Sequence, residues 1–281
     1  MSSLLNFLAI GVALGALYGL IATSMGLIWQ STKVLDLAVG GYAAVAGMVT
    51  AAVGFPWGAL AGLAAGVAAS LVMGVIFLAL QRRGVTDQIS AAFASIGLLF
   101  ASTSFVLWYF GTDPRYVEFI TGTWLLGDIS FSRQGVFNVA VAFVVVGAVL
   151  WGMHRTPAGE VLRATAISPR NAQLIGVPVR RVQLSMFALS GLLAGGAGVL
   201  MVFTRGMSFG LGLTLTIAAF GAMIVFGVRG LVTALLGGLV IGVVEAVGAG
   251  YFPASVASMV PLIFIFAVLV SGRFKLEGAR P

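Results

Sequence analysis

Nine stretches of about 20 mostly apolar residues follow one another along the chain, and a helix of that length crosses the hydrocarbon core of a bilayer. They lie near residues 4–29, 34–53, 58–80, 90–110, 135–153, 183–203, 208–228, 231–250 and 254–272. Only two contain a charged residue, Asp36 in the second and Glu245 in the eighth. The eighth stretch is short and could be re-entrant or broken. We therefore expect an all-α polytopic membrane protein, a bundle of 8–9 transmembrane helices forming one domain over residues 1–281.

The composition supports this assignment. Charged residues make up 8% of the chain, whereas a soluble domain carries about 25%. The net charge of +7 comes from basic residues scattered singly between the apolar stretches, which favours topology signals over a nucleic-acid-binding patch. There is no cysteine, and hence no disulfide or thiolate metal site. The first apolar run is too long for the core of a signal peptide, so we interpret it as a retained first span.

The longest polar interval, residues 155–181, separates the fifth and sixth apolar stretches. Two short helical runs are predicted within it, residues 159–167 and 170–175, because Pro169 suits a first helical turn and Gly176 suits a helix end. Apolar residues alternate with polar ones along the interval, namely Val161, Leu162, Ala166, Leu174, Ile175 and Val177. Exposed apolar area usually marks a contact site. We expect a soluble protein to bind here; the alternative is a solvated linker.

The basic residues also predict the orientation. Placing residues 155–181 in the cytoplasm puts every one of the 15 basic residues inside except Arg115, Arg133 and Arg205. The opposite orientation reverses that ratio, so the positive-inside rule decides between them. Residues 111–134 then form an outer loop that is long enough to hold a small helix for an external partner.

The two intramembrane acids are candidate pathway residues, because an unpaired carboxylate within a span is costly. Glu245 is expected either to line the pathway or its gate, or to lock its helix to a neighbouring one. Asp36 either serves the pathway or has a structural role, pairing with Lys33 or capping the second helix.

The sequence lacks a phosphate loop of the GxxxxGK[ST] type and the zinc motif HExxH. Its one histidine, His154, lies at the inner edge of the fifth stretch and is interpreted as a polar anchor. We predict that the chain is not an enzyme and binds no cofactor or metal of its own, so that any ATP would be bound by another chain.

Glycines recur at close to four-residue spacing on single helix faces, which allows helix backbones to approach closely. They are Gly11, Gly15 and Gly19; Gly58, Gly62 and Gly66; and Gly191, Gly195 and Gly198. We expect these faces to be packing seams.

Several motifs resemble one known family. They are GEVLRA (residues 159–164), AQLIGV (172–177) and FALSGLLAG (187–195), with LGALYGLIATSMGLIW (14–29), SIGL (95–98), FGTDPR (110–115) and GGLVIG (237–242). Together they resemble the LivH-like permease subunits of branched-chain amino acid ATP-binding-cassette (ABC) importers, over nearly the whole chain. The resemblance implies a heterodimeric assembly in a bacterial cytoplasmic membrane. Its partners would be a homologous second permease (LivM-like), two cytoplasmic ATPases and an extracytoplasmic solute-binding protein.

The same resemblance implies that residues 155–182 hold the coupling helix, which inserts into a cleft on an ATPase. The implied coupling residues are Arg163, Arg170, Asn171, Ala172 and Gly176. Arg163 would be a polar contact at the rim, and the small residues Ala172 and Gly176 would allow close approach.

The sequence departs from the family in three places. Arg170 stands where the family usually has a glutamate, DLAVG (36–40) replaces Asn-Phe-Ala-His-Gly, and SGRFKL (271–276) replaces the usual ending. The solute is therefore left open among branched-chain amino acids, amides, urea and organic acids. Two other functions remain as alternatives: a proton-coupled secondary transporter with Glu245 or Asp36 as relay, and a non-transporting membrane scaffold.

Overall fold

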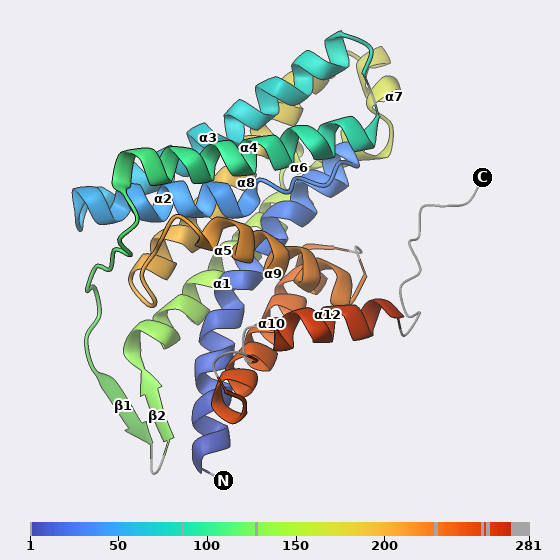
Figure 1. Ribbon diagram of the computed structural model, residues 1–281. Coiled ribbons are helices and arrows are strands. Elements are labelled where there is room, and N and C mark those ends of the chain that lie inside the picture. The colour runs from blue at the N-terminus through green and yellow to red at the C-terminus, as the bar shows by residue number, and fades with distance from the viewer. Residues whose placement is uncertain are drawn as a thin grey trace.

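The computed structural model describes residues 2–85, 87–126, 129–227, 230–253, 256 and 259–270, and it is predominantly helical (Figure 1). Six helices are long and apolar enough to cross a membrane: α1 (Ser2–Thr32), α3 (Trp57–Arg82), α4 (Gln88–Phe110), α5 (Arg133–Arg155), α8 (Val179–Val202) and α10 (Leu231–Tyr251). Three apolar helices are shorter: α2 (Val39–Val53), α9 (Leu211–Val225) and α12 (Val260–Val270). The all-α polytopic fold is confirmed. Each predicted apolar stretch contains a helix, although only six of these helices have the length of a full span.

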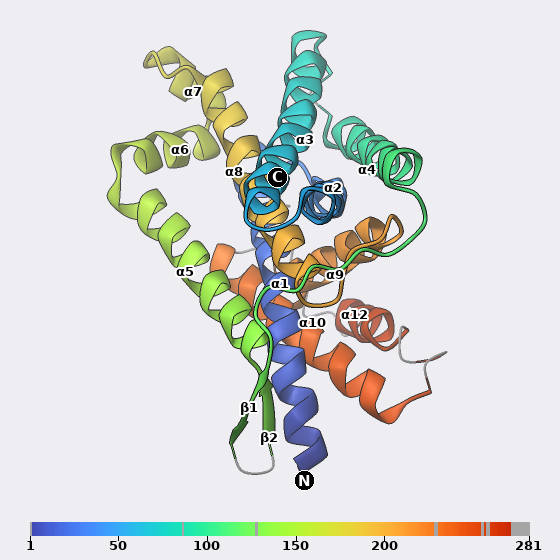
Figure 2. The same ribbon diagram turned by 90° about the vertical axis from the view of Figure 1, so that its left-hand side faces the viewer.

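The two ends of the bundle differ in structure. The short helices α6 (Pro157–Ile167) and α7 (Pro169–Leu174) lie at one end, together with the turn between α3 and α4 (Figure 2). The N-terminus lies at the opposite end beside an antiparallel hairpin of β1 (Thr123–Leu126) and β2 (Ile129–Ser132). Arg82 ends α3 at the first end, and Arg133 begins α5 next to the hairpin. Described basic residues therefore divide between the ends as the predicted orientation requires.

The centre of the bundle is a glycine seam between α1 and α10. A Cβ atom added at Gly11 would lie 2.7 Å from the Cα atom of Val243, and one added at Gly15 would lie 2.6 Å from the Cα atom of Leu239. Contacts this short leave no space for any side chain, so the helix backbones are in direct contact. The predicted packing face on α1 is confirmed.

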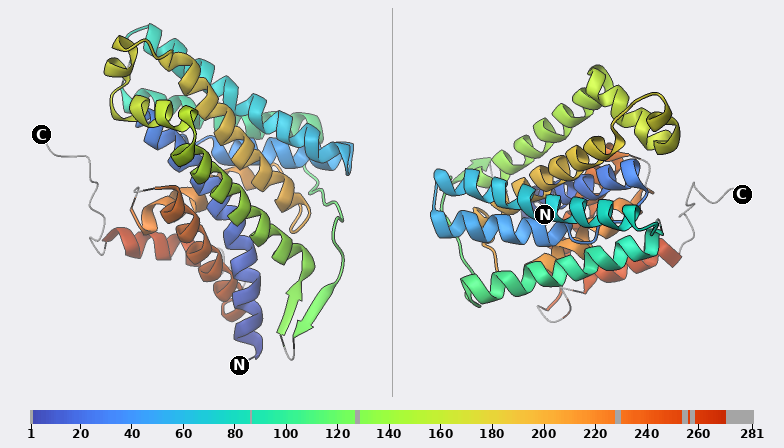
Figure 3. Two further views of the ribbon diagram at one scale, coloured as in Figure 1. Left: turned by 180° about the vertical axis from the view of Figure 1, so that it is seen from behind. Right: turned by 90° about the horizontal axis from the view of Figure 1, so that it is seen from above.

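A second seam joins α2, α3 and α8. A Cβ atom added at Gly66 on α3 would lie 2.8 Å from the Cα atom of Gly195 on α8, and one added at Gly191 would lie 2.7 Å from the carbonyl oxygen of Gly66. Figure 3 shows α3 and α8 running side by side. The small residues predicted on these two helices therefore face each other, and the three helices form one tightly packed layer.

The outer loop is long enough for a small helix, but its described residues 111–126 and 129–132 form an extended segment and a hairpin instead. Gly111 and Gly122 adopt positive φ angles (83° and 99°), and Pro114 lies between them, which breaks a helical run. The strands that follow pair Trp124 with Phe131 across the hairpin, and aromatic residues of this kind favour a pleated backbone.

Candidate functional site

The polar segment between α5 and α8 folds as two capped helices. The Thr156 hydroxyl accepts the backbone N–H of Gly159 (3.1 Å) at the start of α6, and the Ser168 hydroxyl accepts that of Asn171 (3.3 Å) at the start of α7. In each helix a proline follows the capping residue, where its missing N–H costs nothing. Gly176 then ends α7 with a φ angle of 85°. The two predicted helical runs are confirmed.

The predicted coupling residues fall into different environments within this segment. Arg163 donates from Nη1 to the carbonyl oxygen of Met153 (2.6 Å), which ties α6 to the end of α5. The Ala172 side chain is buried, whereas Asn171 is exposed. Gly176 has open space where a side chain would stand. The side chain of Arg170 lies outside the described part of the structure, although its backbone belongs to α7.

Three large apolar side chains stand out at the tip of this segment. Ile167 is 86% exposed, Leu174 is 81% exposed and Ile175 is 77% exposed. The other apolar positions of the interval, such as Leu162 and Val177, are half-buried. The sequence analysis did not single out Ile167, but its place at the last residue of a short helical run was a usable signal. We call these three exposed side chains the apolar tip; the segment of α6 and α7 that carries them lies at one end of the bundle (Figure 2).

The second predicted site is centred on Glu245 in α10. Its Oε2 accepts the Tyr18 hydroxyl (2.8 Å), and its Oε1 accepts Nη1 of Arg205 (3.1 Å). The same Arg205 nitrogen also donates to the Tyr18 hydroxyl oxygen (3.1 Å). The side chains of Arg205 and Glu245 are 46% and 20% exposed at the surface of this chain. Sequence reasoning identified Glu245 but neither of its partners.

Asp36 is fully buried in the connection between α1 and α2. Its Oδ1 accepts the backbone N–H of Ala38 (3.0 Å), and its Oδ2 accepts the Tyr42 hydroxyl (2.9 Å). Among the described residues it makes no ion pair within 4.0 Å, and α2 has Ala38 as its N-cap with no side-chain cap hydrogen bond, so neither the pairing with Lys33 nor the helix cap is observed. It shares no hydrogen-bond partner with Glu245.

Polar contacts from two other helices fix the residue after Asp36. The Leu37 N–H donates to the Ser95 hydroxyl of α4 (3.0 Å), and the Leu37 carbonyl oxygen accepts the Thr216 hydroxyl of α9 (3.1 Å). The unwound backbone at this point is therefore satisfied inside the protein, as the interior of a membrane requires.

Residues 7–269 match the family model described as branched-chain amino acid transport system / permease component. The chain belongs to this family. It is a permease subunit of an ABC importer, a class that works with ATPase and solute-binding partners, and neither a secondary transporter nor a scaffold is supported.

Individual relatives of this permease are distant. It is 27% identical to the probable branched-chain amino acid permease LivH of Methanocaldococcus jannaschii, over 92% of this chain and 88% of the relative. It is 25% identical to BraD, a high-affinity branched-chain amino acid permease of Pseudomonas aeruginosa, over 92% and 91%. It is also 25% identical to the ribose import permease RbsC of Escherichia coli, over 75% and 68%.

A solved structure shares the fold. The complex of PsaBC from Streptococcus pneumoniae with a Fab matches with a TM-score of 0.50 and 13% identity, over 94% of this chain and 91% of that one. At this identity the likeness concerns the arrangement of helices alone.

Proposed function

We propose that this permease carries a branched-chain amino acid, or a related small amide or organic acid, across the bacterial cytoplasmic membrane. The names of two relatives specify branched-chain amino acids, whereas a third relative is a ribose permease. The amino acid relatives match over more of the chain than the sugar relative does. A homologous second permease of the LivM type, two cytoplasmic ATPases and an extracytoplasmic binding protein complete the proposed importer, and ATP is bound by the ATPases.

The observation that carries the proposal is the apolar tip formed by Ile167, Leu174 and Ile175. Each side chain is more than three-quarters exposed on a compact helical segment, away from the membrane-spanning helices. Apolar residues in such a position gain by entering a cleft on a partner. The segment of α6 and α7 is therefore the proposed contact with an ATPase.

The other predicted coupling residues support the segment in different ways. Arg163 holds α6 against α5. The side chain of Ala172 is buried, and its small size lets α7 pack closely against the rest of the protein. Exposed Asn171 and the open backbone at Gly176 are free to meet the ATPase surface, and we assign Arg170 to the same contact.

Asp36 and Glu245 are proposed to border the solute pathway. Asp36 lies in the connection between α1 and α2, Glu245 lies within α10, and each accepts a tyrosine hydroxyl. Glu245 is partly exposed and Asp36 is buried. This difference supports Glu245, rather than Asp36, as the acid that meets a passing solute.

The test is transport by the complete importer reconstituted in proteoliposomes. Replacing Leu174 and Ile175 together with serine is expected to abolish ATP-driven uptake while the permease still assembles in the membrane. The matched control is Ile89→Ser, an apolar residue that is 63% exposed at the start of α4 and outside the tip. Uptake that persists in the double variant, or that falls equally in the control, contradicts the proposed contact.

A further inference from the structure

The loop between α8 and α9, residues 203–210, is attached to the outer segment that follows α4. Met207 donates its N–H to the carbonyl oxygen of Arg115 (2.8 Å) and accepts the Arg115 N–H (2.9 Å). The Val117 N–H donates to the carbonyl oxygen of Val202 (3.3 Å) at the end of α8. These bonds make one small antiparallel connection, so the outer segment and the loop move together.

Aromatic packing strengthens the same attachment. Phe119 of the outer segment lies 5.1 Å from Phe203 of the loop, measured between ring centroids, and 4.6 Å from Phe55 between α2 and α3. Offset aromatic contacts at these distances stabilise an interface beyond the area they bury. Tyr116, between the backbone contacts, is 55% exposed.

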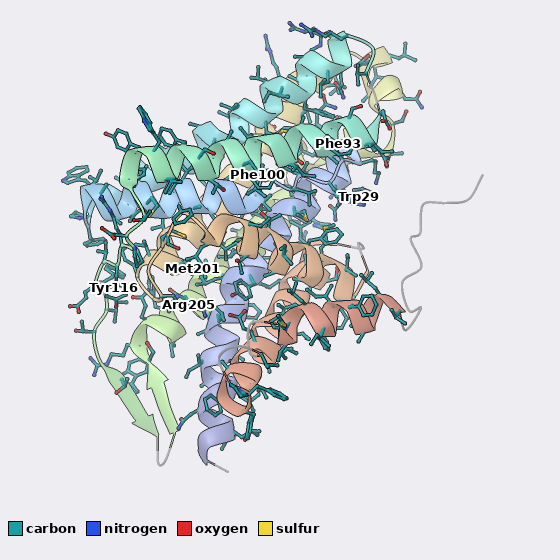
Figure 4. The ribbon with its side chains drawn as sticks, viewed as in Figure 1. Trp29, Phe93, Phe100, Tyr116, Met201 and Arg205 are labelled. Atoms are coloured by element: carbon teal, nitrogen blue, oxygen red, sulfur yellow. The ribbon has the colours of Figure 1, made fainter. Side chains whose placement is uncertain are left out.

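The loop is also attached in the opposite direction, to the centre of the bundle. Arg205, two residues before Met207, bonds to Glu245 of α10 and to Tyr18 of α1 through a single guanidinium nitrogen. Figure 4 shows Arg205 and Tyr116 on the same side of the molecule. The loop therefore joins the outer surface to the two helices of the central glycine seam.

The geometry of the ion pair between Arg205 and Glu245 favours its release. Arg205 uses one nitrogen for both contacts, whereas an arginine that holds a carboxylate firmly binds it through two parallel hydrogen bonds. Both side chains are also partly exposed, and an exposed ion pair contributes little to stability. Among the described residues, no other acidic side chain has a cation within 4.0 Å.

We propose that Arg205 is a positioning residue that transmits docking of the extracytoplasmic binding protein from the outer segment, residues 111–120, to α1 and α10. Docking displaces the segment and the attached loop, and Arg205 then leaves Glu245 and Tyr18. Glu245 loses its counter-ion within a span, which favours a different arrangement of the seam helices. The inference rests on the proposed importer, because it needs a binding protein and ATPases.

The experiment compares the ATPase rate of the complete reconstituted importer with and without solute-loaded binding protein. In Arg205→Gln and in Glu245→Gln, we expect the ratio of stimulated to basal rate to fall about fivefold or more, the lower end of a typical coupling between sites. The double variant should be no worse than either single one, because both remove the same contact. The matched control is Arg133→Gln, an outer arginine that makes no ion pair within 4.0 Å with any residue the structure describes.

If the contact between Arg205 and Glu245 only stabilises the fold, the same experiment gives a different result. Thermal stability and both rates would then fall together, leaving the ratio at its wild-type value, and that outcome overturns the inference. A second measurement tests the surface itself. The chain has no cysteine, so a photoreactive maleimide on Tyr116→Cys should cross-link to the binding protein, and one on Ser90→Cys at the other end should not.

Cross-linking at Ser90 alone would also overturn the inference. Failure of the importer assignment is distinguishable, because the wild-type assembly itself would then show no stimulation by the binding protein.

Discussion

The seam between α1 and α10 makes a quantitative prediction for Gly15→Ala. The added Cβ atom would lie 2.6 Å from the Cα atom of Leu239, 2.8 Å from the carbonyl oxygen of Gly238 and 2.9 Å from that of Leu239. All three are backbone atoms and cannot rotate away. Carbon atoms pack best at about 3.5–4.0 Å, so α10 must move away from α1 by roughly 1 Å.

Two opposing effects set the size of the change. Alanine is about 1 kcal/mol better than glycine inside a helix, whereas overpacking a tight contact costs about 1–3 kcal/mol and occasionally more. We expect a net loss of roughly 1–2 kcal/mol in the free energy of unfolding. The assay is reversible unfolding of the purified permease in mixed micelles, followed by tryptophan fluorescence.

Gly97→Ala is the control for this prediction. Gly97 lies within α4 with no atom within 4 Å of its added Cβ, so only the helix preference changes, and the variant should be as stable as wild type or slightly more so. Equal stability of the Gly15 and Gly97 variants would refute the argument that the two backbones are in contact at this seam.

Three further predictions concern the candidate sites. Gly176→Trp and Gly111→Trp both force a tryptophan into a positive φ angle with open space around it, at a cost of about 1–3 kcal/mol each. Uptake assays should show lost coupling in the Gly176 variant alone, and equal uptake in both would argue against a docking role. Asp36→Leu leaves the Tyr42 hydroxyl buried without its acceptor, so unfolding should become easier by about 1–3 kcal/mol, and an unchanged unfolding curve would contradict this structural role. Glu245→Leu removes a partly exposed ion pair and also leaves the buried Tyr18 hydroxyl without its acceptor, so it should likewise cost about 1–3 kcal/mol and should strongly lower uptake; a loss of stability without a loss of uptake would mark a purely structural pair.

Local sequence signals predicted most of the fold. Hydrophobic runs indicated each membrane helix, because a span must bury its own backbone polar groups. Glycine spacing identified Gly11, Gly15 and Gly19 as a packing face, and the seam with α10 confirms it. The prolines and capping residues around α6 and α7 predicted both short helices, because capping depends on residues only three positions apart.

Contacts between distant residues could not be predicted in the same way. Tyr18 and Glu245 are 227 positions apart, and Arg205 and Glu245 are 40 apart. Helical periodicity states which face a residue occupies but not which helix lies opposite. The hairpin was missed because its strands are four residues each, too short for an alternating pattern to be decisive. The buried position of Ala172 likewise depends on how α7 packs, and its role in coupling stays a prediction.

The central claim is that the segment of α6 and α7 contacts an ATPase on the cytoplasmic side. The most direct measurement attaches a photoreactive maleimide to Ile175→Cys, in a chain that has no other cysteine, and illuminates the assembled importer in native membranes. We predict a cross-link from position 175 to the ATPase, and none from the same probe on Trp57→Cys, which is 72% exposed at the turn between α2 and α3. A probe at position 175 that reacts only with lipid or with an extracytoplasmic protein would contradict the account.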